Sequence, residues 1–83
     1  MAPSPRFCVV YSAHARRRMR KRGITEEEVE RVALDPDATW PSGTRPNGVE
    51  ARGRLPDGRV LHLCLQPEGG GVHLLVTAYW YVP

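Results

Sequence analysis

The sequence predicts an α+β domain in which two N-terminal helices pack on an antiparallel sheet of three to four strands. In the first part of the chain, residues 12–34 have apolar residues at helical spacing, flanked by helix start and stop signals. After residue 48, apolar residues alternate along the chain and are interrupted by turns rich in glycine and proline. Helices followed by consecutive strands are typical of an α+β fold with the helices on one sheet face.

The first predicted helix lies between Ser12 and Gly23. The Ser12 hydroxyl can accept a hydrogen bond from an unpaired amide of the first turn, and Gly23 can take the left-handed conformation that ends a helix. Ala15 and Met19 are four residues apart and therefore share one stripe, which we expect to face the core.

The same helix carries a row of cationic side chains. His14, Arg18 and Arg22 recur every four residues, so their side chains lie in line on a face adjacent to the apolar stripe. The rest of the helix surface is covered by Arg16, Arg17, Arg20 and Lys21. An imidazole in line with two guanidiniums is suited to handling phosphate, although a solvated basic helix has the same appearance.

The second predicted helix begins with a capping box, in which Thr25 is the N-cap and Glu28 is the third helical residue. It ends at Asp35-Pro36, because a residue before proline is disfavoured in helical conformation. Its apolar stripe, which we expect to pack on the core, consists of Val29, Val32, Ala33 and Leu34.

The rest of the chain divides into strands and connections. Residues 35–48 contain three prolines and two glycines and predict a loop, and strands are expected at 49–55, 59–65 and 72–82. Residues 1–10 form a lead-in, disordered over residues 1–5, with an edge strand at 6–11, and residues 11–83 form the single domain. In the last strand, simple alternation places on one face Val72, Leu74, Val76, Ala78 and Trp80.

Length and charge restrict the function. A chain of 83 residues has a small core, which favours a surface groove over an enclosed cavity for any site. Residues 1–25 hold seven basic and no acidic residues, whereas residues 26–83 hold five basic and nine acidic ones. This asymmetry indicates a polyanion-binding face, with nucleic acid as the commonest partner. A solvated basic face or an acidic protein partner would give the same distribution.

The sequence gives no support for a metalloprotein, a secreted protein or a membrane protein. The three histidines lie on separate predicted elements, and no histidine or cysteine spacing typical of a metal site occurs, so we expect no metal and no other cofactor. Cys8 and Cys64 are interpreted as small buried hydrophobic residues, and a disulfide between them is the alternative. Residues 1–5 lack the features of a secretory signal, and no apolar run approaches the about 20 residues of a membrane span. We therefore expect a cytoplasmic protein without membrane contact.

The remaining polar residues suit metal-independent cleavage of RNA. This reaction needs groups that move protons and cations that stabilise charge on the phosphate, and histidine and arginine have these properties. From the helix these groups are His14, Arg18 and Arg22. Further candidates from the sheet are Arg54, Arg59, Thr77 and Tyr79, whereas His62 and His73 are interpreted as ordinary strand residues.

A longer motif extends this interpretation. Its helical part is Tyr11-Ser12-x-His14-Ala15-x-x-Arg18-Met19-x-x-Arg22-Gly23-Ile24-Thr25-Glu26-Glu27-x-Val29, and it is followed by Asp35-Pro36, Asp57-Gly58 and Val76-Thr77-x-Tyr79. With these residues the chain resembles, over about residues 11–80, the bacterial domain-of-unknown-function 4258 family. The resemblance implies a RelE-like fold, within the barnase–EndoU–colicin–RelE group of small metal-independent ribonuclease toxins. It implies that His14, Arg22 and Arg18 match the helical polar positions and that Thr77 matches the last-strand polar position.

These observations lead to a specific expectation. His14 acts as general acid or base, Arg18 and Arg22 bind the scissile phosphate, and Thr77 orients a substrate oxygen or a catalytic side chain. Other RNA contacts are expected from Arg16, Arg17, Arg20, Lys21, Arg54, Arg59 and Tyr79. The expected partners are RNA and an acidic antitoxin protein, and the oligomeric state is left open. The alternatives are a non-catalytic RNA-binding module and a protein-interaction domain that uses the basic helix.

Overall fold

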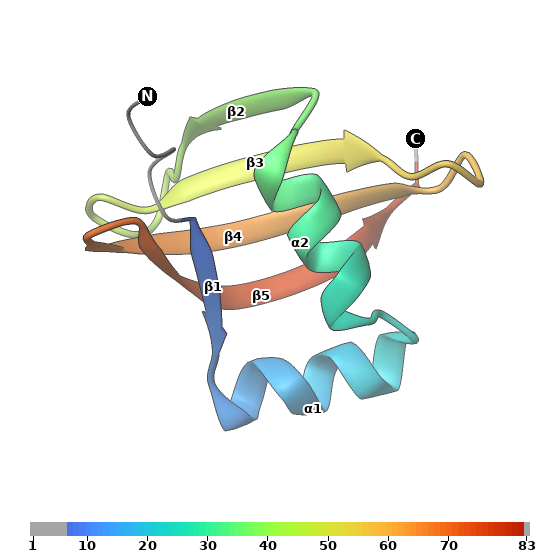
Figure 1. Ribbon diagram of the computed structural model, residues 1–83, viewed down its shortest axis with the longest axis horizontal. Helices are drawn as coiled ribbons and strands as arrows, with labels where there is room; N and C mark the ends of the chain where they lie inside the picture. The colour runs from blue at the N-terminus through green and yellow to red at the C-terminus, as the bar shows by residue number, and fades with distance from the viewer. Residues whose placement is uncertain (1–6, 83) are drawn as a thin grey trace, which may run out of the picture.

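Two helices and five strands follow one another in the computed structural model, which describes residues 7–82 (Figure 1). Strand β1 precedes the helices and four strands follow them. The elements are β1 (Cys8–Tyr11), α1 (Ala13–Arg22), α2 (Glu26–Leu34), β2 (Ala38–Pro41), β3 (Val49–Arg54), β4 (Val60–Gly69) and β5 (Val72–Tyr81). The predicted α+β class is therefore confirmed.

Both helices begin and end at the predicted signals. The Ser12 hydroxyl accepts a hydrogen bond of 3.0 Å from the Ala15 amide, and Gly23 has the left-handed φ of 67° that ends α1. At the start of α2 the capping box between Thr25 and Glu28 has both of its hydrogen bonds. Local signals in the sequence therefore decide where both helices begin.

The sheet differs from the prediction in strand number and direction. It has five strands in the order β1-β5-β4-β3-β2, and β1 runs parallel to β5 while every other neighbouring pair is antiparallel. The expectation of three to four antiparallel strands is therefore wrong. The edge strand expected at residues 6–11 is present at residues 8–11. Its partner strand is 64 residues away in the chain, so a local sequence pattern indicates neither the partner nor the direction of the pairing. The lead-in expected at residues 1–5 lies outside the described residues.

Strand β2 lies within the stretch predicted as a loop. Ala38–Pro41 pairs with β3 and forms one edge of the sheet. A proline is tolerated on an edge strand because its missing amide hydrogen removes no bond that the sheet needs. Residues 35–48, with their three prolines and two glycines, therefore still contain a short edge strand.

The alternation predicted for the last strand is interrupted by a β-bulge. Cys64 pairs with Thr77 while Leu65 pairs with Leu75, so Val76 is an extra residue on β5. As a result Leu75 and Ala78 face the same side, and both are buried. The assignment of Val72 and Leu74 to the face of Ala78 and Trp80 is therefore wrong, because the bulge shifts the period by one residue.

The hydrophobic core lies between the helices and one face of the sheet. Helix α2 crosses this face and contacts β3 and β4, whereas α1 lies alongside β5 (Figure 1). Val29, Val32 and Ala33 of α2 are buried, as predicted, but Leu34 is 64% exposed and does not extend the stripe. No helix within residues 7–82 is long and apolar enough to cross a membrane.

The other sheet face, here called the open face, has no helix over it in the described part of the chain. Cys8 is exposed, so its assignment as a buried hydrophobe is wrong, because alternate residues of the edge strand β1 point away from the core. Cys64 is partly buried, and both cysteines are free thiols.

Candidate functional site

Helix α1 covers the part of the β5 edge that β1 leaves unpaired. Strand β1 pairs only with residues 72–75 of β5. Beyond them, Arg22 donates a hydrogen bond of 2.8 Å from Nη1 to the Ala78 carbonyl oxygen, with a longer contact of 3.4 Å to Thr77 Oγ1. In return, the indole Nε1 of Trp80 donates to the Arg22 carbonyl oxygen at 2.7 Å. The C-terminal end of α1 is therefore anchored to β5.

The row of cations on α1 lines a surface hollow, here called the basic hollow. Its volume is about 390 Å³, and it is lined by His14, Arg17, Arg18, Lys21 and Arg22. Within residues 7–82, none of these five side chains forms an ion pair with a carboxylate. Clustered cations without acidic partners give the hollow a positive potential that attracts anions.

Within this hollow His14 and Arg18 are in direct contact. Arg18 Nε donates a hydrogen bond of 2.8 Å to His14 Nε2. Because a guanidinium can only donate, this nitrogen of His14 is the acceptor, and in the neutral ring the hydrogen lies on Nδ1. The contact therefore orients the imidazole and leaves Nδ1 available to a ligand.

Other basic residues named in the sequence analysis do not line the hollow. Arg16 forms an ion pair with Glu26 and lies over the Tyr11 ring. Arg59 pairs with Glu28 and Asp57, and Arg54 donates to the Gly58 carbonyl oxygen in the turn between β3 and β4. Arg20 is exposed in the last turn of α1.

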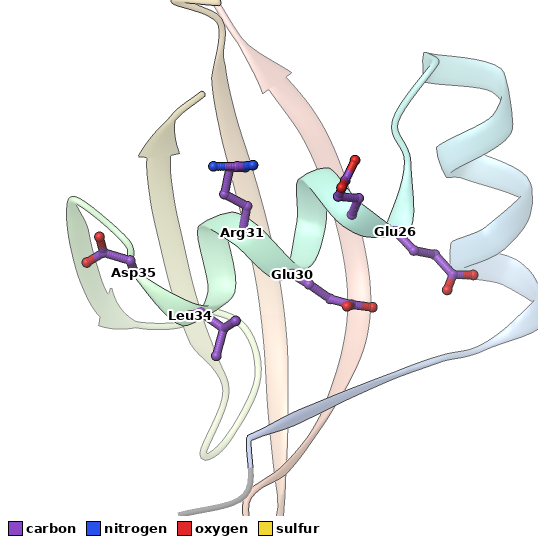
Figure 2. Close-up of a pocket in the computed structure, with 6 residues that line it drawn as sticks. Glu26, Glu30, Arg31, Leu34 and Asp35 are labelled. Atoms are coloured by element: carbon purple, nitrogen blue, oxygen red, sulfur yellow. The ribbon is translucent and has the colours of Figure 1, made fainter. Parts of the chain in front are cut away.

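A second, larger hollow has the opposite charge. Figure 2 shows it on the outer side of α2, where it has a volume of about 620 Å³. It is lined by Glu26, Glu27, Glu30, Arg31, Leu34 and Asp35. Four carboxylates against one guanidinium repel a phosphate. The basic hollow is therefore the candidate anion site although it is smaller.

The open face carries a cluster of aromatic and polar side chains centred on His62. This side chain is buried, its Nε2 lies 2.8 Å from Glu50 Oε1, and its ring stacks on Tyr79 with 4.6 Å between centroids. Arg52 lies over the Tyr81 ring at 3.7 Å and places Nη2 at 3.5 Å from His62 Nδ1. His62 is thus held on both ring nitrogens.

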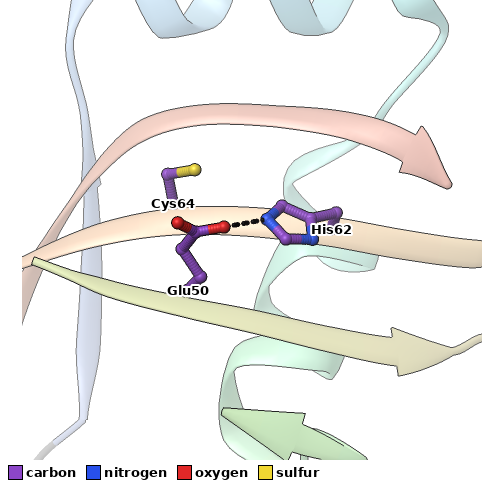
Figure 3. A group of neighbouring side chains, drawn as sticks. All are labelled: Glu50, His62 and Cys64. Atoms are coloured by element: carbon purple, nitrogen blue, oxygen red, sulfur yellow. Dashed lines mark hydrogen bonds and ion pairs between the residues drawn. The ribbon is translucent and has the colours of Figure 1, made fainter. Parts of the chain in front are cut away.

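Cys64, on β4, lies next to the pair formed by His62 and Glu50 (Figure 3). Burial raises the pKa of the Cys64 thiol, and the nearby Glu50 carboxylate raises it further. Burial likewise raises the pKa of Tyr79. The thiol and the phenol are therefore held in their neutral forms in this cluster.

Sequence reasoning missed Glu50, Arg52 and Cys64 as members of a site. They come together because the register of β3 and β4 pairs Glu50 with Cys64 and Arg52 with His62. Residues i and i+2 of a strand share a face, so this face could have been found had the register been known. The spacing within each strand gives no signal by itself.

The basic hollow and the open face meet at Thr77. Thr77 pairs with Cys64, and Tyr79 pairs with His62, so both side chains belong to the open face. Arg22 reaches Thr77 from the hollow. The fold therefore places His14, Arg18 and Arg22 in one hollow and brings Arg22 to Thr77, whereas Tyr79 lies two residues beyond Thr77 on β5.

Comparison with curated proteins and with solved structures gives no match to the chain. Comparison with protein families gives a match over residues 11–80 to the family described as Domain of unknown function (DUF4258). The matched region contains both helices, the basic hollow and the open-face cluster apart from Tyr81. The chain therefore belongs to the DUF4258 family.

Proposed function

We propose that this protein binds RNA through the basic hollow and cleaves it without a metal ion, as a RelE-like ribonuclease of toxin type. The observation that carries the proposal is the set of four cations beside His14 on one side of α1, none of which has an acidic partner within residues 7–82. Such a set attracts anions, and because its side chains follow one another along one side of α1, a phosphodiester chain can contact several of them at once.

The two arginines of the row have free donors for a phosphate. A guanidinium has five N–H groups. Arg22 uses Nη1 for Ala78 and Thr77, and Arg18 uses Nε for His14, so Nη2 and one further nitrogen of each remain free to bind oxygen. The partly buried Arg22 guanidinium is held in place by its contacts with β5. It therefore binds a phosphate with little further loss of conformational freedom.

The proposed reaction is a transesterification within RNA. The 2′-oxygen forms a bond to the adjacent phosphorus, and the bond from phosphorus to the 5′-oxygen breaks. A base takes the proton of the 2′-hydroxyl and an acid returns one to the 5′-oxygen, which leaves a 2′,3′-cyclic phosphate and a 5′-hydroxyl. His14 performs one of these proton transfers at Nε2 after Arg18 has turned from this nitrogen to the phosphate, and Arg18 and Arg22 stabilise the charge on the phosphate.

The open face extends the proposed substrate path. Thr77 holds the Arg22 guanidinium and is a positioning residue. Beyond it Tyr79 is 39% exposed, so its ring is accessible to a base of the bound strand. The same basic hollow suits an acidic antitoxin protein, which would cover the cations and block the RNA path.

The test is cleavage of a mixed-sequence RNA in EDTA by wild-type protein and by His14→Ala and Arg18→Ala. We expect His14→Ala to slow cleavage by about 100-fold or more, because it removes proton transfer. Arg18→Ala should slow cleavage and also weaken RNA binding. Product ends are analysed for the 2′,3′-cyclic phosphate.

Arg31→Ala is the matched control, since it removes one arginine from the outer side of α2 and none from the hollow. It should cleave at the wild-type rate. Equal cleavage by His14→Ala and wild type would show that His14 is not the catalytic group. Equal losses in Arg18→Ala and Arg31→Ala would show that only total charge matters.

A non-catalytic RNA-binding module is the second candidate. It is favoured by the contacts of Arg22, whose bonds to Ala78 and Thr77 already explain this side chain as an anchor of α1. RNA binding that depends on Arg18 but yields no cleavage would establish this alternative.

A further inference from the structure

Three side chains with metal-ligating atoms converge on the open face (Figure 3). Glu50 comes from β3, and His62 and Cys64 come from β4. A carboxylate oxygen, an imidazole nitrogen and the sulfur all lie within 4.8 Å of one another. Oxygen, nitrogen and sulfur donors of this kind are the ligands that Zn²⁺ takes in proteins.

The backbone holds these ligands in place. Glu50 and Cys64 are directly opposite each other in the β3–β4 ladder, and His62 is two residues from Cys64, so all three project from the same face. The His62 ring contacts the ring of Tyr79 and the Glu50 carboxylate, and the residue as a whole is only 1% exposed. The ligand positions therefore rest on regular strands and on a buried ring.

We propose that Glu50, His62 and Cys64 form a binding site for a thiophilic divalent cation of the Zn²⁺ type. The site has three protein ligands, which leaves a fourth position for water or a ligand on the open face. This inference does not rest on the proposed cleavage of RNA, whose reacting groups line the basic hollow and not the open face.

Binding requires small rearrangements of side chains. Zn²⁺ bonds of about 2.0–2.3 Å place the ligand atoms of a tetrahedral site about 3.5 Å apart. Because all three atoms already lie within 4.8 Å of one another, no separation has to close by more than about 1.3 Å, whereas the 2.8 Å contact between His62 and Glu50 must open. Both changes need rotations of side chains, and the Cys64 thiol, which burial keeps neutral, must release its proton to solvent when the ion binds.

Arg52 determines how tightly the ion binds. When Nε2 of His62 binds a cation, Nδ1 carries the ring hydrogen, and this hydrogen then faces Arg52 Nη2, a donor at 3.5 Å. The guanidinium also adds a positive charge beside the ion. Arg52 therefore weakens binding of the ion. Replacing Arg52 by an uncharged residue should strengthen binding, in contrast to replacing a ligand.

The experiment is a titration of the reduced protein with Co²⁺, followed by absorption spectroscopy. A thiolate bound to Co²⁺ gives a charge-transfer band in the near ultraviolet, and we expect this band to saturate at one ion per chain. Zn²⁺ should abolish the band by displacing Co²⁺. The measurement contains no RNA, so it is unaffected by the outcome of the cleavage test.

Variants identify the ligands. Cys64→Ser should lose the band, whereas Cys8→Ser, which removes the other, exposed thiol, should retain it. Glu50→Gln, which keeps the shape of the side chain, should bind Co²⁺ at least about tenfold more weakly. Arg52→Met should bind it about tenfold more tightly, within the range of effects that residues next to the ligands have on metal affinity.

Three results would overturn the proposal. These are the absence of the band in wild-type protein, its persistence in Cys64→Ser, and its loss in Cys8→Ser. Weaker binding by Arg52→Met would contradict the role given to Arg52. Because Glu50→Gln and Arg52→Met are expected to change affinity in opposite directions, general loss of folding cannot imitate the predicted pattern.

Discussion

At the scale of single residues, side chains of the family motif have structural roles that their chemistry alone does not reveal. Arg22 binds the carbonyl oxygen of Ala78, and Trp80 binds the carbonyl oxygen of Arg22. These two bonds satisfy backbone groups at a helix end and at a strand edge, where no neighbouring backbone is available. A polar residue of a motif can therefore serve the fold and the site at once.

The indole bond at this junction can be tested by Trp80→Phe. The substitution keeps an aromatic ring but removes the Nε1–H that reaches the Arg22 carbonyl oxygen at 2.7 Å. We expect the free energy of unfolding to fall by about 1 kcal/mol, measured by urea denaturation. The control is Trp40→Phe, because the Trp40 indole makes no hydrogen bond within residues 7–82. Equal losses in both variants would show that ring size, and not the hydrogen bond, matters.

At the scale of elements, the close approach of α2 to β3 explains a glycine in the middle of a strand. A Cβ on Gly53 would lie 3.0 Å from Cγ1 of Val32. The backbone of Gly53 is not left-handed, so the absence of a side chain serves packing and not conformation. The small residue lets the helix lie close to the sheet and bury Val32.

A double-mutant cycle tests this contact. Gly53→Ala should destabilise the protein by about 1–3 kcal/mol through overpacking, and Val32→Ala by about 2 kcal/mol through lost burial. In the double variant the new methyl group occupies the space that Val32 vacates. We therefore expect the combined loss to be smaller than the sum by about 1 kcal/mol or more. Strict additivity in thermal or urea unfolding would exclude the contact as the cause.

At the scale of the whole molecule, charge is separated between the two helices. The basic hollow of α1 and the acidic hollow of α2 lie on consecutive elements of the chain (Figures 1 and 2). We therefore expect an anionic strand to be attracted to one helix and repelled by the other, and so to be oriented along α1 as it approaches.

This separation predicts the salt dependence of RNA binding. For a single strand, each phosphate contact contributes about −0.7 to the slope of log affinity against log salt concentration. Arg17→Ala should reduce the magnitude of the slope by about 0.7, whereas Arg31→Ala should leave it unchanged. Fluorescence anisotropy with a labelled RNA at several salt concentrations measures this slope for the wild-type protein and for both variants. The same slope in all three proteins would remove Arg17 from the contact surface.

The local features of this protein could be read from the sequence. Ser12, Gly23 and the capping box of Thr25 and Glu28 set the limits of the helices, because each acts through backbone groups within a few residues. The four-residue spacing of His14, Arg18 and Arg22 likewise places them on one side of α1, since helix geometry alone determines it.

The tertiary structure decided what depends on partners distant in the chain. The parallel pairing of β1 with β5 and the bulge at Val76 follow from packing and register, which local patterns do not encode. The same register brings Glu50 beside His62 and Cys64, and the docking of α1 brings Arg22 to Thr77. The sequence by itself determined which helices form and which charges they carry. Contacts across the sheet decided which of those side chains share a site, because strand neighbours are chosen by the fold as a whole.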